Sequence, residues 1–434
     1  MSDAARDLIA FIDASPTPYH AVAEVSRRLA AAGFRECAER ELWSLEPGDR
    51  RWVVRNGGSL VAFQVGSESP IEGGFRIVGA HTDSPNLRVK PVADLTAHGY
   101  RQLAVEPYGG ILLHTWLDRD LSIAGRVTLR DGDATRTLLV DFGRPLARVP
   151  SLAIHLNRDL KEKGLQLNPQ TQALPLIGLE DAPALAALVA TELRAQQLAD
   201  VAPADLLAFD LMLYDVQPSG LIGADGAFIV APRLDNQASC HAAVSALLGA
   251  AGGELCRATR AIALYDHEEV GSESAQGAGG SFLVDALERV VSAFKGGAPQ
   301  GFARARSRSQ LVSADMAHGV HPNFADKHEP LHRPVLGRGP VIKTNVNQSY
   351  ATDALTAGEF AALCARVGVT PQHFSSRNDQ PCGSTIGPIT AAHTGIATVD
   401  VGNPMLSMHS CREMAGTADV APMIRVLQAF FAGA

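Results

Sequence analysis

Strand and helix patterns alternate along the C-terminal half of the chain, and this alternation limits the fold more than any other feature. After Pro232, a helical pattern over Asn236–Ala250 is followed by an apolar strand at Ala261–Tyr265, a helix at Ser281–Phe294 and a strand at Leu311–Ala314. A strand that is followed by a helix usually returns to the same sheet in parallel. We therefore expect an α/β domain with a mostly parallel sheet that is covered by helices on both faces.

The same alternation continues to the end of the chain. A strand at Val341–Thr344 precedes a helix that opens with a capping-box pattern at Thr356–Glu359. A strand at Ile396–Val401 and a final helix from Thr417 to Phe431 complete the series. These segments are predicted to belong to the same domain.

The N-terminal segment is predicted to supply two helices, a hairpin and a buried strand. Thr17 is suited to cap the second helix, with Pro18 at its first position. Asn56-Gly57 lies between two short strands and supplies the positive φ angles of a tight hairpin. The apolar strand Phe75–Ala80 then leads to His81-Thr82-Asp83.

The segment from 93 to 231 has a different character and reads as a β-rich unit of its own. The expected elements are strands at Ile111–Trp116, Leu121–Leu129, Thr135–Phe142 and Phe209–Val216, and a helix at Pro183–Leu198. We therefore predict one α/β domain, residues 1–92 and 232–434, that is interrupted by an inserted β-rich domain, residues 93–231.

Composition excludes several classes of protein. The 434 residues carry 38 basic and 46 acidic side chains, a net charge of 38 − 46 = −8, which gives no reason to expect a nucleic-acid partner. No run approaches the ~20 apolar residues of a membrane span, and the first residues lack the order of a signal peptide. The six cysteines include no CxxC pair, which favours reduced thiols and a cytoplasmic protein.

Acidic and imidazole side chains follow the predicted strands, open the helix after Pro232 or, near the C-terminus, follow a loop. They are His81, Asp83, Asp235, Glu268, Glu269, Asp315 and His409. Ligands collect at the carboxyl ends of strands in open α/β sheets, so these side chains are expected to gather there. Imidazoles and carboxylates without cysteine are suited to a catalytic zinc ion or to a pair of divalent ions.

The individual acids suggest different tasks. A pair of metal ions roughly 3.5–4 Å apart needs a bridging carboxylate, and Asp235, directly before a helix, is suited to that position. Glu268 and Glu269 are neighbours at a strand end, where successive side chains point to opposite sides. One of them can therefore hold metal while the other accepts a proton from an attacking water.

Each of these residues also has a structural explanation when it is taken alone. Asp83 could form a turn, Asp235 could cap a helix, and Glu268-Glu269 could be a solvated strand exit. The sequence contains no GxxxxGK[ST], GxSxG or HExxH motif, which argues against a phosphate loop, a serine elbow and the commonest single-zinc peptidase helix. The set as a whole carries the metal-site prediction.

Six strings along the chain together resemble the aspartyl aminopeptidase family of two-zinc metallopeptidases. They are Ser15-Pro16-Thr17-Pro18-Tyr19-His20, Gly79-Ala80-His81-Thr82-Asp83-Ser84-Pro85, Ala153-Ile154-His155-Leu156-Asn157-Arg158, Pro232-Arg233-Leu234-Asp235-Asn236, Asp266-His267-Glu268-Glu269-Val270-Gly271-Ser272 and Met408-His409-Ser410. The resemblance implies a two-zinc catalytic domain, a β-rich dimerisation domain and a large homo-oligomer built from dimers. It also implies release of N-terminal residues, preferentially Asp or Glu, from peptides.

The resemblance also assigns roles to residues. It implies that the metal ligands are His81, Asp235, Glu269, Asp315 and His409. Glu268 matches the general base, and Asp83 lies behind His81 as the residue that orients it. His155, in the inserted domain, matches a motif near the active site, as a metal ligand or a substrate-binding residue that a neighbouring subunit could supply. Manganese or cobalt could substitute for zinc.

Lys343 is the residue best suited to hold an acidic substrate side chain. It lies in the predicted strand Val341–Thr344, which runs toward the same sheet edge as Asp315. The segment continues to Tyr350 in a stretch that resembles the substrate wall of the family, so Tyr350 is also expected to bind substrate. A surface lysine at a strand end is the alternative. Two other functions also stay open: a related two-metal carboxypeptidase or amide deacylase, and a non-catalytic oligomeric assembly protein that keeps metals only for structure.

Overall fold

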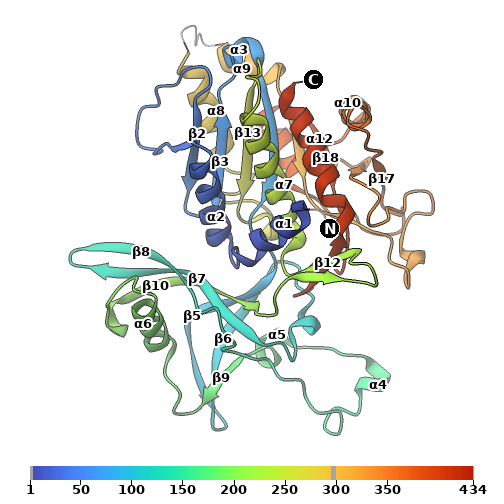
Figure 1. Ribbon diagram of the computed structural model, residues 1–434. Helices are drawn as coiled ribbons and strands as arrows, with labels where there is room; N and C mark the ends of the chain where they lie inside the picture. Colours follow the sequence, from blue (N-terminus) through green and yellow to red (C-terminus); the bar gives the residue numbers. More distant parts are fainter. Residues whose placement is uncertain (1–2, 295–299, 434) are drawn as a thin grey trace. The chain divides into compact units, whose positions relative to one another are not determined.

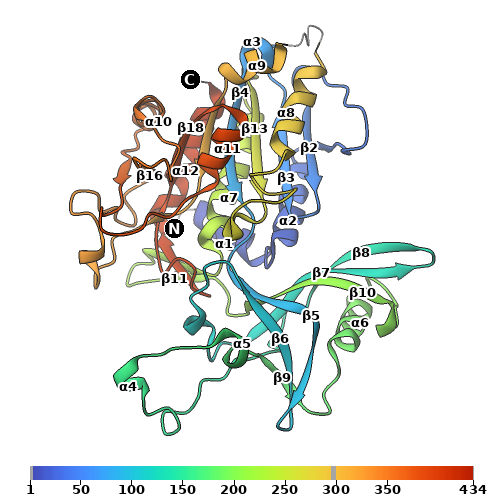
Figure 2. The ribbon, with the colours of Figure 1, turned by 180° about the vertical axis from the view of Figure 1, so that it is seen from behind.

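The computed structural model describes residues 3–294 and 300–433, which form two compact units (Figures 1 and 2). The first unit consists of residues 3–83, 219–408 and 413–433 within the described range, and the second of residues 84–218 and 409–412. All six cysteines are free thiols. Within the described residues, no helix is both long and apolar enough to cross a membrane.

A nine-stranded sheet forms the centre of the first unit. In spatial order its strands are β1 (Arg35–Glu36), β2 (Arg50–Arg55), β3 (Ser59–Gln64), β13 (Thr259–Tyr265), β4 (Phe75–His81), β14 (Gln310–Ala314), β18 (Ala397–Gly402), β16 (Val341–Lys343) and β17 (Gln372–Phe374). The central strands β13, β4, β14 and β18 are all parallel to their neighbours within that group. The prediction of a mostly parallel α/β sheet is therefore confirmed.

Helices cover both faces of this sheet. They are α1 (Asp3–Asp13), α2 (Pro18–Ala31), α3 (Pro70–Gly73), α7 (Leu234–Ala251), α8 (Phe282–Ser292), α9 (Gly301–Ser307), α10 (Ala354–Arg366), α11 (Ile386–Thr394) and α12 (Val420–Ala432). Figure 1 is seen from the side of α7 and α12, and Figure 2 from the side of α8 and α11.

Alternate residues of the central strands enter the two hydrophobic cores. On β4, Val78 packs with α2, α7, α10 and α12, whereas Ile77 packs with α8 and α11. Ile262 and Ala263 of β13 divide in the same way. This period of two, with both faces apolar, is why the central strands read as continuous apolar runs in the sequence.

A smaller five-stranded sheet completes the first unit. Its strands, in spatial order, are β11 (Gly220–Ile222), β12 (Phe228–Ala231), β20 (Glu413–Gly416), β19 (Pro404–Leu406) and β15 (Ala317–His318). The short 3₁₀ helices of this unit are η3 (Glu268–Val270), η4 (Ala325–Lys327) and η5 (Thr417–Asp419).

The second unit is built on a six-stranded antiparallel sheet. Its strands, in spatial order, are β8 (Ala134–Asp141), β7 (Leu121–Asp131), β10 (Leu206–Asp215), β5 (Asn86–Ala97), β6 (Tyr100–Tyr108) and β9 (Leu176–Leu179). Its helices are α4 (Leu160–Lys163), α5 (Pro169–Gln172), α6 (Leu185–Ala195), η1 (Leu113–Trp116) and η2 (Pro203–Asp205).

The boundaries of these units differ from the predicted 93 and 231. β5 begins at Asn86 and runs through Lys90-Pro91 as one strand, so the second unit starts at Ser84. β12 pairs with β20, which places residues from Ser219 onward in the first unit. These pairings join segments far apart in the chain, and local sequence patterns do not reveal them.

Local predictions succeeded where turn chemistry was specific. Asn56 and Gly57 adopt φ values of 51° and 71° between β2 and β3, as the hairpin requires. Thr17 caps α2 by accepting a hydrogen bond from the backbone N–H of His20.

Two other local predictions differ from the structure. Residues 111–116, predicted as a strand, instead contain η1, and α10 begins at Ala354 with Asp353 as its cap. The capping box thus lies three residues earlier than predicted.

Candidate metal centre

The carboxyl ends of three neighbouring parallel strands bring the predicted acids together. His81 is the last residue of β4 and is the register partner of Tyr265, the last residue of β13. Glu268 follows Tyr265 after two residues, and Asp315 directly follows β14 on the other side of β4. The order of the parallel strands therefore fixes which loops meet at this edge.

His81 lies at the centre of the cluster and is 1% exposed. Its Nε2 atom is 3.3 Å from Asp235 Oδ1, 3.4 Å from Asp315 Oδ1 and 3.9 Å from Glu268 Oε2. Potential ligand atoms of His81, Asp235 and Asp315 lie within 4.8 Å of one another, and so do those of His81, Glu268 and Glu269. These two groups share His81 and offer only nitrogen and oxygen.

Asp83 orders both the imidazole and the glutamate pair. The backbone oxygen of Asp83 lies 3.0 Å from His81 Nδ1, and a carbonyl can only accept, so Nδ1 carries the proton and Nε2 is left to bind a cation. The carboxylate of Asp83 accepts the backbone N–H groups of Glu268 and Glu269, each at 3.1 Å. Asp83 thereby ties β4 to the loop after β13.

The sequence predicted that the glutamate pair lies in extended chain, but the structure places it in a helical turn. Glu268 and Glu269 form the 3₁₀ helix η3, which follows His267 in a left-handed conformation with φ of 68°. Successive side chains diverge around a 3₁₀ helix by about a third of a turn rather than by half. The expectation that the two side chains point to opposite sides is therefore wrong, although both residues reach the cluster.

Asp235 is held by a carboxylate that sequence reasoning missed. Its backbone N–H donates to Glu413 Oε2 at 2.9 Å, and Glu413 is itself buried in β20. The next residue, Asn236, donates from Nδ2 to the backbone oxygen of Ala314, directly before Asp315. Glu413 does not belong to any motif that the sequence analysis recognised. The pairing of β20 with β12 brings it to the start of α7.

Burial and the crowding of carboxylates shift the protonation equilibria of the cluster. Burial raises the pKa of Glu268 to about 8, opposed by His81 and reinforced by Asp315, Asp83 and Asp235. Burial and the Asp235 carboxylate likewise raise the pKa of Glu269 well above its usual value. Burial alone would lower the pKa of His81, but the surrounding carboxylates raise it far above 6.5. A bound cation would relieve this crowding of carboxylates.

The donor set therefore fits a metal centre. Carboxylate oxygens and an imidazole nitrogen whose second nitrogen is hydrogen-bonded are the ligands that zinc and similar divalent ions accept in catalytic sites. The cluster contains more carboxylates than a single zinc ion requires, which leaves one of them available as a base.

Lys343 is buried beside the cluster. Its Nζ atom donates to the backbone oxygens of Asp315 at 2.9 Å and Met316 at 3.3 Å, and lies 3.6 Å from Asp315 Oδ2. The ring of Tyr350 lies 5.2 Å from the same atom. Lys343 is thus not the surface lysine that was the alternative, and its charge is placed next to a predicted metal ligand.

Two predicted site residues, His409 and His155, belong to the second unit. His409 has a left-handed backbone with φ of 67°, and its Nδ1 atom lies 3.0 Å from the backbone oxygen of Gly110. Its own backbone oxygen accepts the N–H of Leu112 at 3.0 Å. His155 is exposed in a turn between η1 and α4.

Comparison with known proteins identifies close relatives over nearly the whole chain. The family described as "Aminopeptidase I zinc metalloprotease (M18)" matches residues 11–431. A relative from Pseudomonas aeruginosa named "Probable M18 family aminopeptidase 2" is 49% identical over 98% of this chain and 97% of its own length. A relative of the same name from Pseudomonas entomophila is 50% identical over the same shares.

Solved structures show the same similarity. The chain in "Cryo-EM structure of the Ape4 and Nbr1 complex" superposes with a TM-score of 0.95 at 40% identity, covering 99% of this chain and 85% of that chain. "Structure of S. cerevesiae mApe1 dodecamer" gives a TM-score of 0.87 at 32% identity, covering 99% and 96%.

Proposed function

We propose that this chain, which belongs to the aminopeptidase I (M18) family of zinc metalloproteases, releases N-terminal Asp or Glu from peptides at a centre of two metal ions. As a member of this family, the protein is a zinc aminopeptidase that hydrolyses peptide bonds. The observation that carries the finer proposal is the cluster of His81, Asp235, Asp315 and the glutamate pair at one sheet edge.

The proposed metal ligands are His81, Asp235, Glu269, Asp315 and His409, with Asp235 shared between the two ions. Support comes from the groups that His81 forms with Asp235 and Asp315 and with the glutamate pair. When bound, a pair of zinc ions supplies Lewis acidity, which polarises a scissile carbonyl and makes an attacking water more acidic. His409 enters this set from its sequence motif.

Glu268 is proposed as the general base. It accepts a proton from the attacking water and returns it to the leaving amine, so that both proton transfers use one carboxylate. Burial, which raises its pKa to about 8, gives this carboxylate a higher proton affinity than an exposed glutamate has. Asp83 acts through others: it holds His81 and the backbone of η3 in position.

We propose that the protein works as a homo-oligomer built from dimers, with the second unit as the dimerisation domain. The family includes a dodecamer, mApe1. The exposed position of His155 in that unit is compatible with a role as metal ligand or substrate contact in a neighbouring subunit. Replacement of zinc by manganese or cobalt and a cytoplasmic location both stay predictions.

A panel of dipeptides tests the activity and its direction. The panel varies the first residue and includes peptides with a blocked α-amine and a free carboxylate. An aminopeptidase leaves the blocked peptides intact, whereas a two-metal carboxypeptidase or amide deacylase cleaves them. Equal cleavage after Asp, Glu and Leu in the zinc-loaded protein would contradict the proposed preference for acidic residues. Faster cleavage after Asp and Glu than after Leu is expected.

Lys343→Met is expected to reduce kcat/KM for Asp-initiated peptides by about 30- to 1000-fold, or ~2–4 kcal/mol, the cost of leaving a buried charge without its partner. Lys343 is proposed to meet the substrate carboxylate beside Tyr350, since its ammonium is the buried cation next to Asp315. Leu-initiated peptides should lose much less. Exposed Lys327 supplies the control, Lys327→Met, which should change neither substrate.

Equal losses on the two substrates would contradict the selection role. Lys343 also donates to the backbone oxygens of Asp315 and Met316, so equal losses would mean that it supports the metal ligand instead. Metal content of the Lys343→Met protein distinguishes these roles, because a failing Asp315 would also release metal.

A further inference from the structure

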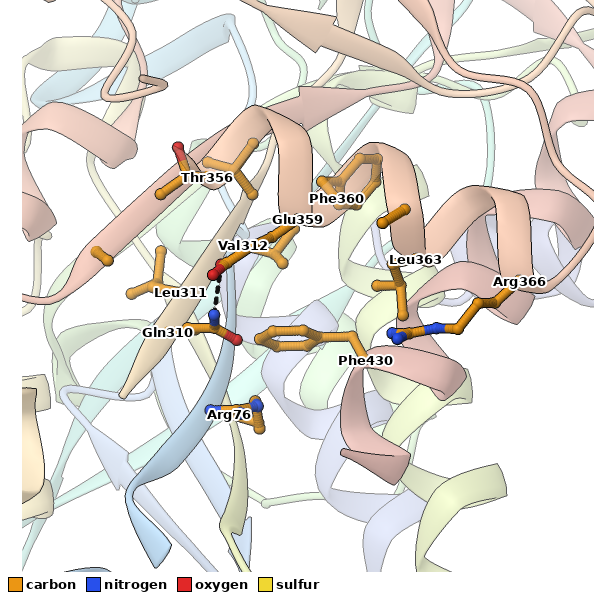
Figure 3. A pocket seen from close by; sticks show the side chains of 13 residues that line it. Arg76, Gln310, Leu311, Val312, Thr356, Glu359, Phe360, Leu363, Arg366 and Phe430 are labelled. Carbon is orange, nitrogen blue, oxygen red and sulfur yellow. Dashed lines mark hydrogen bonds between the residues drawn. The ribbon is translucent and has the colours of Figure 1, made fainter. Parts of the chain in front are cut away.

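A cavity of about 270 Å³ opens at the amino ends of the strands whose carboxyl ends carry the metal centre (Figure 3). It is lined by residues at the start of three strands: Arg76, the second residue of β4, Gln310, the first of β14, and Ala397, the first of β18. Arg76 precedes His81 by five residues along β4, which separates them by about 16 Å at ~3.3 Å per residue. This amino-end pocket is therefore distinct from the proposed active site.

Part of the wall of the amino-end pocket is apolar, and this part comes from two helices and the sheet. Val312 and Val399 are buried on the sheet, Phe360 and Leu363 come from α10, and Phe430 comes from α12. In Figure 3 the ring of Phe430 points into the pocket between Arg76 and α10. Such a surface can cover one face of a ring or a branched alkyl group.

Arg76 brings a guanidinium to this apolar surface. Its Nη1 atom makes a long hydrogen bond of 3.4 Å to the backbone oxygen of Arg308, and its guanidinium lies 6.0 Å from the ring of Phe430. Burial lowers the pKa of Arg76, only partly offset by Cys256 and Glu359. In the described part of the chain Arg76 makes no ion pair. Arg76 lines the cavity, so its remaining N–H donors are available to a carboxylate placed there.

The remaining charged groups of the pocket set the charge that a ligand should have. Arg366 on α10 adds a second guanidinium, and Glu359 on α10 adds one carboxylate, which accepts a hydrogen bond from Gln310 Nε2. The lining thus has a net charge of +1. A singly charged anion balances this charge. A dianion would leave an excess negative charge beside the Glu359 carboxylate, which repels it.

We propose that the amino-end pocket binds a small monocarboxylate that carries an aryl or branched apolar group. The carboxylate pairs with Arg76, whose planar fork matches two carboxylate oxygens, and the apolar group lies on Phe430, Phe360 and Leu363. A phosphate ester shares the anionic chemistry but carries close to two charges, so it fits the lining less well. This site does not depend on the proposed peptidase mechanism.

Titration of the zinc-loaded protein with 3-phenylpropanoate, followed by ligand-observed NMR, tests the site. We expect saturable binding with a dissociation constant of about 1 mM or below, as a small ligand with one ion pair and one buried ring allows. Arg76→Met should weaken binding at least about 10-fold, because a charge-assisted bidentate pair is lost. Arg425→Met, on the exposed side of the same α12 that carries Phe430, should change it less than about 2-fold.

Two further arms keep the test decisive if Arg76→Met does not fold. Ala362 is an exposed pocket residue on α10, so Ala362→Trp fills the cavity from its rim and should also weaken binding at least about 10-fold. The neutral 3-phenylpropanamide should bind that much more weakly than the carboxylate. The proposal would be overturned if 3-phenylpropanoate bound equally well to wild type, Arg76→Met and Ala362→Trp. Tighter binding of 2-phenylethyl phosphate than of 3-phenylpropanoate would also overturn it.

Discussion

Glu268→Gln is expected to lower kcat by about 10²- to 10⁴-fold while the protein keeps its metal, because the amide cannot accept the proton of the attacking water. The substitution preserves size and leaves in place the backbone N–H that Asp83 accepts. KM should change much less than kcat, since the loss arises after substrate has bound. Steady-state kinetics on an Asp-initiated dipeptide, with elemental analysis of the same sample, measures both quantities.

Two neighbouring glutamates supply the matched controls. Glu269→Gln should weaken metal binding, because Glu269 is the proposed ligand of the pair, and its activity should be partly restored by added zinc. Glu273→Gln changes an exposed carboxylate four residues further along and should stay within about 2-fold of wild type. If Glu269→Gln keeps its metal and loses kcat while Glu268→Gln loses its metal, the two roles are reversed.

Removal of metal by a chelator is expected to abolish peptidase activity. It should also lower the melting temperature, because the buried acids around His81 would lose the cation that offsets their mutual repulsion. Zinc, and also manganese or cobalt, should restore activity on addition. Magnesium serves as the control, since it prefers all-oxygen coordination and should restore less.

Full turnover by protein that elemental analysis shows to be metal-free would contradict this prediction. A melting temperature that does not change on removal of the metal would argue that the carboxylates are neutralised in another way. Peptidase activity and melting temperature are measured independently. A protein that loses activity by aggregation can therefore be distinguished from one that has only lost its metal.

The sequence was informative about the site because parallel strands deliver their following residues to one edge. His81 and Asp315 were predicted as site residues from this rule, and they lie where β4 and β14 end. Asp235 was identified from its position before a long helix, and the start of α7 does bring it to His81. The hydrophobic period and the order of strands carried this part of the prediction.

Other features depend on contacts between distant parts of the chain, which no local pattern encodes. Glu413 reaches Asp235 through the pairing of β20 with β12, more than 170 residues apart in the chain. The 3₁₀ conformation of Glu268 and Glu269 follows from the left-handed His267 and from the two hydrogen bonds to Asp83. A pattern-based prediction could not choose this turn over extended chain.

The burial of Lys343 shows the same limit. Its sequence flanks indicated a strand end near Asp315, and β16 does lie there. Its hydrogen bonds to the Asp315 and Met316 backbone, however, depend on how the segment after β14 folds back. The sequence could propose the residue but could not assign these partners.

Stoichiometric titration of the metal-free protein with zinc tests the central claim most directly. If His81, Asp235, Glu269, Asp315 and His409 hold two ions with Asp235 between them, peptidase activity should rise with added zinc and reach its plateau at about two ions per chain. Asp235→Asn should lower both the metal content and the plateau. A plateau at one ion per chain, or an Asp235→Asn protein with unchanged metal content and activity, would contradict the two-metal centre.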